Sequence, residues 1–257
     1  MAPDMQKVLD RYIVEDTIAK YSPGGQFEVK PGIYHISQLT GASCLMKVLV
    51  QRRQIMQDVA EGVTRRQAEF IRSELPLLRQ AMRGTILHEA FGRIYREGLP
   101  GRVVREGVEV AHQVPSQLVP GHSFTLTGTC DIYDLSEDSV VEFKTVKHAG
   151  FTGWSTRSTT VPGVSHVPHE FHMLQGNAYG YLLGAKQYVV TYIDAEELVT
   201  KEWPRPVAAA SFEPLVKSAE FLFHSETQGK VHPEILRASV EEWKCRSCPV
   251  SGECEVE

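Results

Sequence analysis

The strongest constraint in the sequence is the stretch GTCDIYDLSEDSVVEFKT, which predicts two strands around the polar turn DLSED. Side chains alternate between the two faces of a strand, so Glu142 and Lys144 point the same way. If Asp134 pairs with Ser139 across the turn, Asp131 lies directly opposite Glu142. Two carboxylates ~4 Å apart at an effective dielectric of ~20 repel each other by about 4 kcal/mol. A hairpin of this kind therefore calls for a partner that offsets the repulsion.

A divalent cation between Asp131 and Glu142 is one such partner, because carboxylate oxygens suit Mg²⁺ or Mn²⁺. Lys144 on the same face could then orient a metal-bound water or help to deprotonate it. A metal, an activated water and a nearby cation are what phosphodiester hydrolysis requires. The alternative interpretation places these charges on an exposed hairpin face, with Glu142 and Lys144 weakly paired.

Length and composition favour an ordinary soluble protein. The chain has 257 residues, of which 42% are hydrophobic and 23% charged, so one domain with appendages can bury a sizeable core. The sequence has no apolar run long enough to cross a bilayer, and the N-terminus MAPDMQKVLDRY does not read as a signal peptide. We therefore expect a cytoplasmic protein with no membrane partner, in which the five cysteines do not form disulfides.

Charge is distributed unevenly along the chain. The net charge is −5, yet residues 44–105 hold twelve basic and six acidic side chains, a local charge of +6 against −11 for the remainder. This asymmetry predicts a surface that binds a polyanion. Arg-rich but merely solvated helix faces are the alternative.

The order of elements predicts an α/β domain. Helices are expected over residues 3–20, after Ser37 and over 64–97, the last broken near Pro76. Strands follow at 103–114, 123–133 and 139–146, and after a long polar loop come a helix at 169–184, the strand KQYVVTYI and a helix at 211–226. Helices beside a small mixed sheet give this fold class.

Two helices supply further candidates for a site. GTILHE carries Gly84 and His88 one helical turn apart, and QGNAY carries Gln175 and Tyr179 on one helix face. In isolation His88 reads as a core histidine, and Gln175 and Tyr179 read as ordinary packing. Taken in order, however, GTILHE, GTCD, EFK and QGNAY resemble the RecB-like branch of the PD-(D/E)XK nuclease superfamily.

The resemblance implies a role for each of these residues. It makes His88, Asp131, Glu142 and the backbone carbonyl of Phe143 the ligands of Mg²⁺ or Mn²⁺. It makes Lys144 the catalytic lysine, assisted by Asp131 and Glu142. Gln175 and Tyr179 would complete the catalytic set by binding phosphate or the lysine. The implied fold is a restriction-endonuclease-like core, a small mixed sheet flanked by helices.

The cysteines extend the resemblance. The tail CRSCPVSGEC holds three closely spaced thiols, and one upstream thiol completes a set of four: Cys44, Cys245, Cys248 and Cys254. This set resembles the iron–sulfur RecB-like nucleases, which include CRISPR-associated exonucleases, and implies a [4Fe-4S] cluster that joins the N- and C-terminal segments. Zinc also accepts four thiolates, so spacing alone leaves both metals open. Cys130 is expected to be a small core residue.

Binding of single-stranded DNA would rest on arginines and aromatic stacking. The candidates are Arg52, Arg53, Arg65, Arg66, Trp154 and Arg157. Trp154 and Arg157 lie in the long polar loop after the catalytic strand, which either covers the substrate or is a surface excursion.

The predicted domain organisation is a helical extension followed by one nuclease domain. The extension covers 1–30 and the RecB-like nuclease domain 31–257, divided into an Arg-rich helical part at 37–100, a catalytic core at 101–195 and a C-terminal helix with the Cys-rich tail at 205–257.

The function expected from this resemblance is a metal-dependent DNA exonuclease that acts on single-stranded or frayed ends, 5′ to 3′. The family works in CRISPR adaptation and antiviral defence or in recombination and repair, so the implied partners are single-stranded DNA and the CRISPR integrase complex or other repair proteins. Two alternatives from other classes stay open: a DNA-binding accessory protein with a vestigial nuclease site, and a redox sensor built on the cluster. The oligomeric state is open.

Overall fold

The computed structural model divides the chain into two compact units. It describes residues 10, 12–17, 19, 29–40, 44–60, 75–146 and 168–237. The first unit comprises Met1–Ile33, Cys44–Thr85 and Leu222–Glu257, and the second comprises Tyr34–Ser43 and Ile86–Phe221. Two helices, α5 (Leu75–Gly98) and α8 (Glu213–Gln228), contribute to both units. The predicted catalytic core therefore lies within the second unit.

The described chain contains one mixed sheet. Its strands are β1 (Ile33–His35), β2 (Val104–Pro115), β3 (Ser123–Asp134), β4 (Ser139–Val146), β5 (Gln187–Asp194) and β6 (Thr200–Pro206). The order is β1-β3-β4-β5-β6, and β2 also pairs with β3. The pairs β2–β3, β3–β4 and β5–β6 are antiparallel, whereas β4 and β5 are parallel. Helix α7 (Glu170–Leu183) connects β4 to β5 in the sequence. This small mixed sheet with flanking helices confirms the expected α/β class.

The hairpin adopts the register predicted from the sequence. Asp134 pairs with Ser139 across the turn, and Ile132 pairs with Val141. Asp134 is fully buried, and its Oδ1 accepts the backbone N–H groups of Ser136 and Glu137 at 3.0 and 3.1 Å. Such an aspartate stabilises a tight turn by replacing main-chain partners. The DLSED segment is therefore a turn whose geometry fixes the register of both strands.

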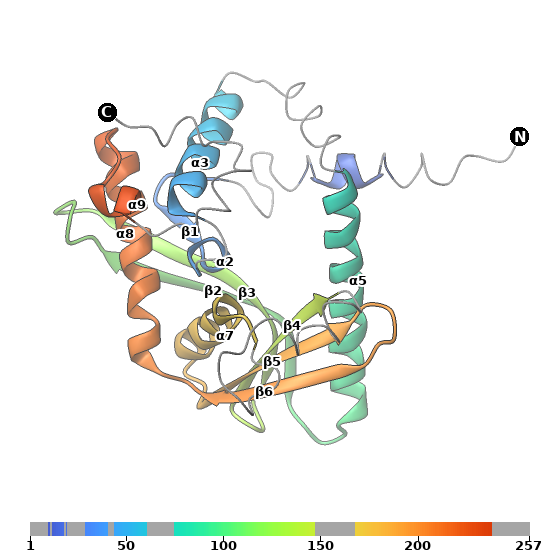
Figure 1. Ribbon diagram of the computed structural model, residues 1–257. Coiled ribbons are helices and arrows are strands. Elements are labelled where there is room, and N and C mark those ends of the chain that lie inside the picture. The colour runs from blue at the N-terminus through green and yellow to red at the C-terminus, as the bar shows by residue number, and fades with distance from the viewer. Residues whose placement is uncertain are drawn as a thin grey trace, which may run out of the picture. The chain divides into compact units, whose positions relative to one another are not determined.

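Helices cover β4 from two sides. Phe91 and Tyr95 of α5 pack on a buried cluster that includes Ile132, Val141 and Phe143. Side chains alternate along β4, so Glu142 and Lys144 point to the other face, which α7 covers (Figure 1).

Helix α7 is held by contacts in its C-terminal half. Its Asn177 exchanges two hydrogen bonds, of 3.0 and 2.8 Å, with the backbone of Ala208. Gly184 ends the helix in the left-handed conformation that favours glycine. The predicted helix at 169–184 and the strand KQYVVTYI are thus confirmed. Helix α5 begins at Leu75, so Pro76 lies in its first turn, where the missing N–H costs no helical hydrogen bond. The part of the predicted helix at 64–74 lies outside the described residues.

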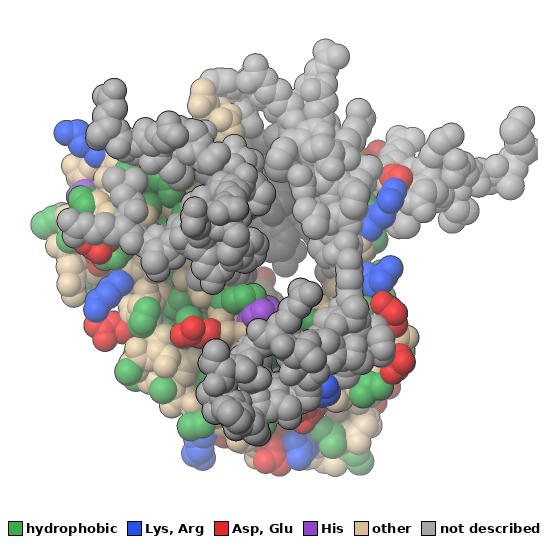
Figure 2. Space-filling model, viewed as in Figure 1, with side chains coloured by type: hydrophobic (Ala, Val, Ile, Leu, Met, Phe, Trp, Pro, Cys, Tyr) green, Lys and Arg blue, Asp and Glu red, His purple; other side chains and the backbone are tan. Residues whose placement is uncertain are grey.

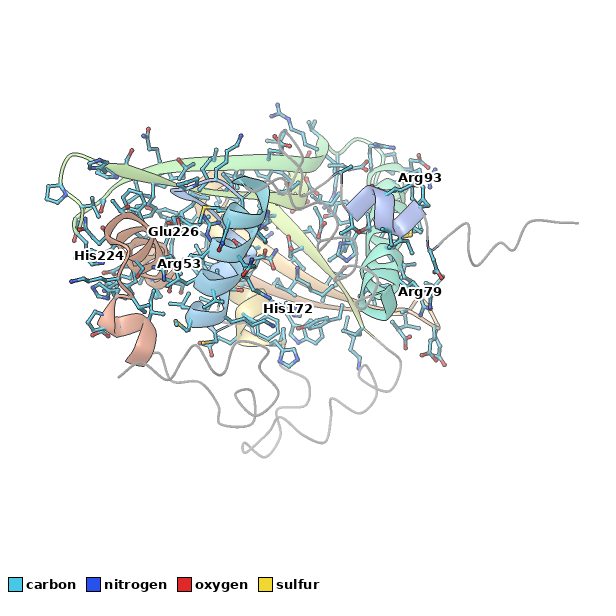
Figure 3. All side chains as sticks on the ribbon, turned by 90° about the horizontal axis from the view of Figure 1, so that it is seen from above. Arg53, Arg79, Arg93, His172, His224 and Glu226 are labelled. Carbon is cyan, nitrogen blue, oxygen red and sulfur yellow. The ribbon has the colours of Figure 1, made fainter. Side chains whose placement is uncertain are left out.

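The first unit contains α3 (Leu45–Ala60), α9 (Pro233–Arg237) and the C-terminal part of α8. Arg53 of α3 and Glu226 of α8 lie close together (Figure 3), and Arg53 Nη2 donates to the carbonyl of Ser225 at 2.9 Å.

Within the described ranges, no helix is both long and apolar enough to cross a membrane. The short α2 (Ile36–Leu39) belongs to the second unit and buries Ile36 and Leu39.

Candidate active site

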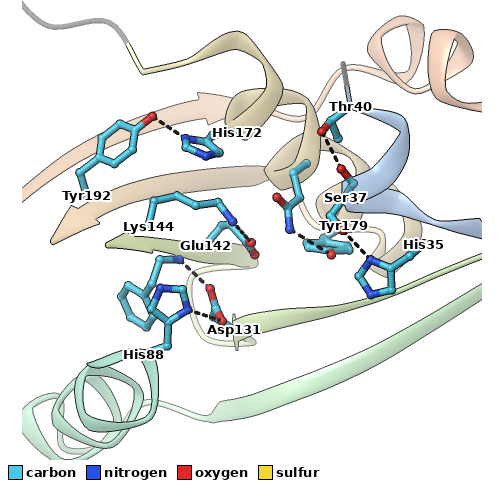
Figure 4. Close-up of polar contacts among 12 residues, drawn as sticks. His35, Ser37, Thr40, His88, Asp131, Glu142, Lys144, His172, Tyr179 and Tyr192 are labelled. Atoms are coloured by element: carbon cyan, nitrogen blue, oxygen red, sulfur yellow. Dashed lines mark hydrogen bonds and ion pairs between the residues drawn. The ribbon is translucent and has the colours of Figure 1, made fainter. Parts of the chain in front are cut away.

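Four of the predicted site residues meet in the second unit (Figure 4). His88 comes from α5, Asp131 from β3, and Glu142 and Lys144 from β4. Nδ1 of His88 lies 3.3 Å from Oδ1 of Asp131, and Lys144 Nζ donates to Oε1 of Glu142 at 2.6 Å. The structure thus brings the sequence motifs together as two linked pairs of side chains.

Asp131 lies one residue beyond the last pair of the β3–β4 ladder. The paired residues run from Asp134 and Ser139 to Ile132 and Val141. One step further, the N–H of Phe143 donates to Oδ2 of Asp131 at 2.7 Å. This hydrogen bond fixes the carboxylate next to the following strand and leaves Oδ1 toward His88. The carboxylate remains about a quarter exposed, because its side chain retains 23% of its accessible surface.

Glu142 is the most buried charged group of the site. Its side chain is 3% exposed, compared with 16% for Lys144. Oε2 has no hydrogen-bond partner among the described residues. Burial outweighs the attraction of Lys144 and raises the pKa of Glu142 to about 7. An unpartnered carboxylate oxygen in such a position is costly unless a cation or a proton occupies it.

The donor set is suited to a hard cation, although it is not closed. Among the described residues, no three His, Cys, Asp or Glu side chains converge closely enough to form a metal site as they stand. The unpartnered Oε2 of Glu142 and the partly exposed Asp131 nevertheless supply the carboxylate oxygens that Mg²⁺ and Mn²⁺ prefer. The residues therefore fit such an ion in their chemistry.

Tyr179 of α7 lies beside this site (Figure 4), and Gln175, four residues earlier, shares its helix face. Gln175 Nε2 donates to the hydroxyl of Tyr179 at 3.2 Å. Tyr179 is fully buried, and burial together with the Glu142 carboxylate raises its pKa. A Cβ atom on Gly128 would lie 2.6 Å from Cε1 of Tyr179, so the aromatic ring requires a glycine at this position of β3.

Sequence reasoning missed two residues beside Lys144. Tyr192 of β5 is the register partner of Lys144, and its hydroxyl lies 2.6 Å from Nδ1 of His172 on α7. His172 precedes Gln175 by three residues, which places both on one helix face. This spacing of three residues is the sequence signal that could have identified His172 as a site residue. The contact with Tyr192 depends on the pairing of β4 with β5.

The structure describes two of the cysteines, Cys44 and Cys130. Cys130 is fully buried, as expected for a small core residue, and burial with the nearby carboxylates of Glu142 and Asp131 raises the pKa of its thiol to about 12. Cys44 is half-buried directly before α3. The other three thiols of the predicted cluster lie outside the described residues: Cys245, Cys248 and Cys254.

The expectation for Arg52 is wrong. Its side chain is 4% exposed and forms an ion pair of 2.6 Å with Glu226, and it also donates to the carbonyl of Lys30 at 2.9 Å. Arg52 is therefore a structural residue of the first unit, because a buried guanidinium cannot reach a phosphate. Arg53 is half-buried and remains a candidate. The other nucleic-acid contacts predicted from the sequence lie outside the described residues: Arg65, Arg66, Trp154 and Arg157.

Other basic residues of the Arg-rich segment also pair with acids. Arg79 pairs with Asp10, Arg96 with Glu97 and Glu106, and Arg102 with Asp134 and Glu137. Figure 2 shows acidic side chains next to basic ones over the described part of the visible face. Because these basic side chains are paired with acids, fewer of them are available to bind a polyanion than the net charge of the segment indicates.

No family model and no curated protein matches the sequence. Among solved structures, the protein SSO0001 matches over 99% of this chain and 97% of its own, with a TM-score of 0.59 and 16% identity. This similarity shows a shared fold. An alkaline exonuclease from Laribacter hongkongensis matches 82% of this chain and 96% of its own (TM-score 0.42, 14% identity). A phage-related exonuclease from Haemophilus somnus 129PT matches 80% and 99% (TM-score 0.41, 14% identity). Matches at these two TM-scores are too distant to bear on function.

Proposed function

We propose that the protein is a divalent-metal-dependent deoxyribonuclease. The observation that carries this proposal is the state of Glu142, a buried carboxylate with one oxygen on Lys144 and the other without a partner among the described residues. Asp131 and His88 lie on the adjacent elements. A buried carboxylate, a second carboxylate and a lysine on one strand pair are the groups that metal-assisted phosphodiester hydrolysis uses.

In this proposal Asp131, Glu142, His88 and the carbonyl of Phe143 would hold Mg²⁺ or Mn²⁺. When bound, the ion would polarise the phosphate and lower the pKa of a water molecule. The residues of the chain orient the reactants. Asp131 is fixed by the N–H of Phe143, and Lys144 presents a cation where negative charge develops on the phosphate. Gln175 and Tyr179 would hold a phosphate oxygen or the ammonium group of Lys144.

The finer assignment follows the sequence resemblance. We propose exonuclease action on single-stranded or frayed DNA ends, 5′ to 3′, in CRISPR adaptation or in recombination and repair. The CRISPR integrase complex or other repair proteins would be the partners. The same resemblance leads us to propose a [4Fe-4S] cluster on Cys44, Cys245, Cys248 and Cys254. The half-buried position of Cys44 directly before α3 is compatible with a ligand role.

A cleavage assay tests the function. Single-stranded DNA labelled at either end is incubated with the wild type in Mg²⁺, in Mn²⁺ and in EDTA. The proposal requires cleavage with either metal ion, none in EDTA, and none by Asp131→Asn or Glu142→Gln at equal folded concentration. Release of single nucleotides from one labelled end would identify an exonuclease and its polarity. DNA binding without cleavage under all conditions would support the accessory-protein alternative instead.

A further inference from the structure

His172 occupies the first turn of α7, on the same side of the sheet as Lys144. Lys144 and Tyr192 are register partners on the parallel strands β4 and β5, so their side chains are neighbours on one face. The Tyr192 hydroxyl lies 2.6 Å from Nδ1 of His172, and the two rings meet edge to face with centroids 5.5 Å apart. Figure 4 shows His172 above the Lys144 side chain, with Nδ1 turned to Tyr192. The imidazole is thus held beside the catalytic lysine.

The contacts of the Tyr192 hydroxyl favour one tautomer of His172. The Tyr192 hydroxyl accepts the backbone N–H of His169 at 3.0 Å, which occupies one lone pair of its oxygen. The hydroxyl can then donate its proton to Nδ1 of His172, 2.6 Å away. With Nδ1 as the acceptor of this hydrogen bond, the single proton of a neutral imidazole lies on Nε2. Nε2 has no hydrogen-bond partner among the described residues, and the side chain is partly accessible to solvent.

Electrostatics keep this imidazole neutral. Burial, Lys144 and His169 together lower the pKa of His172 to about 3. At neutral pH the ring is therefore a hydrogen-bond donor through Nε2 and carries no charge. A neutral donor next to a lysine is suited to an anionic oxygen, because it can bind the oxygen without adding a second cation that repels the lysine.

We infer that His172 is a further substrate-binding residue, whose Nε2–H donates a hydrogen bond to a non-bridging oxygen of the DNA phosphate that Lys144 also faces. Tyr192 is the positioning residue that fixes the tautomer and the ring. This inference rests on the proposed deoxyribonuclease function and adds a contact to it. An alternative role in packing alone would follow from the ring contacts of His172 with Phe171 and His169.

Variants at His172 separate these two roles. His172→Ala should lower kcat/KM by about 10- to 100-fold, the loss expected for a hydrogen bond to a charged oxygen. His172→Gln should recover most of this loss, because its amide can place a donor near the Nε2 position, whereas His172→Asn should not. Tyr192→Phe should cause a smaller loss, of about 3- to 10-fold, by releasing the ring. His122→Ala, which removes an exposed histidine in the β2–β3 turn, serves as the control.

Sulfur substitution in the substrate tests the contact itself. Oligonucleotides with a single Rp or Sp phosphorothioate at the cleaved linkage are compared in Mn²⁺, which tolerates sulfur better than Mg²⁺ does. If Nε2–H contacts one oxygen, sulfur at that oxygen slows the wild type but adds little to the loss in His172→Ala. Equal sulfur effects in the wild type and in His172→Ala for both diastereomers would overturn the inference.

The binding of the same oligonucleotides in Ca²⁺ distinguishes failure of the inference from failure of the proposed function. A wild type that binds DNA but does not cleave it in Mg²⁺ or Mn²⁺ contradicts the nuclease proposal, and weaker binding by His172→Ala than by His172→Gln then still supports the contact. If the wild type does not cleave DNA, equal binding by the wild type and His172→Ala, or no DNA binding by the wild type, overturns it.

Discussion

Nζ of Lys144 lies 2.6 Å from Oε1 of Glu142, while Oε2 of the same carboxylate is buried without a hydrogen-bond partner among the described residues. Lys144 therefore compensates the negative charge at Oε1 of Glu142, whereas no described residue forms a hydrogen bond with Oε2. This asymmetry makes Glu142 both a cost to folding and the most suitable place in the site for a bound cation.

The first prediction concerns pH and stability. Burial raises the pKa of Glu142 from 4.5 to about 7, so between these values the folded protein binds more protons than the unfolded chain. The contribution of this group to stability is therefore present below pH ~4.5 and is lost as the pH rises through ~7. Glu142→Gln should flatten the decline in melting temperature between pH 5 and pH 8 in EDTA. Glu109→Gln, at an exposed position, should leave the wild-type pH profile unchanged, and identical profiles for all three proteins would contradict the prediction.

The second prediction concerns the contact of Tyr179 with β3. In Gly128→Ala the new methyl group would lie 2.6 Å from Cε1 and 2.8 Å from the hydroxyl oxygen of Tyr179, whose ring is fully buried. We expect a loss of about 1–3 kcal/mol in the free energy of unfolding and slower DNA cleavage. Gly98→Ala is the matched control, because nothing lies within 4 Å of the added atom. Denaturant unfolding measures both variants, and equal stability would show that Tyr179 moves freely.

The third prediction concerns the buried ion pair of the first unit. Arg52→Met should lower the free energy of unfolding by about 3–5 kcal/mol, because it leaves Glu226 buried without its partner. The double variant Arg52→Met/Glu226→Met should recover most of this loss. DNA affinity per folded molecule should not change in either variant, as filter binding at matched folded concentration can determine. A stable Arg52→Met variant with weakened DNA binding would restore the original assignment of Arg52 as a phosphate contact.

The fourth prediction concerns the proposed cluster. Cys248→Ser should remove the brown colour and the bound iron of protein that is purified without oxygen, and it should lower the melting temperature. Ligation would join residues distant in sequence and so restrict the unfolded chain. Cys130→Ala should keep its iron, because Cys130 is a core residue. Iron analysis decides this point: zinc in place of iron, or no metal in the wild type, would contradict the cluster assignment.

The hairpin was predictable because local signals determine it. The turn DLSED, the alternation of apolar residues and the repulsion between Asp131 and Glu142 together indicated the register and the site. Strand β6 was not predicted, because Pro204 and Pro206 argue against a strand. In the structure β6 pairs only with β5 among the described strands, and the edge of a sheet tolerates proline.

Contacts between distant segments were not predictable. The sequence of α3 indicates the charge of Arg52, but its partner Glu226 is 174 residues away. The role of His172 was not predictable for a similar reason, because only the pairing of β4 with β5 brings Tyr192 next to Lys144. Local patterns predicted the elements and the candidate ligands, whereas the partners that decide whether a charged side chain is structural or functional depend on the tertiary fold.

The most direct test of the central claim is single-stranded DNA cleavage by Lys144→Ala in Mg²⁺, with DNA binding measured on the same preparation. The account predicts a loss of activity of at least about 100-fold, with affinity changed little, because Lys144 serves the reaction while phosphate contacts elsewhere supply most of the binding. Lys217→Ala, which removes an exposed lysine on α8, should behave as the wild type. Full cleavage by Lys144→Ala would contradict the assignment of this site as a nuclease centre.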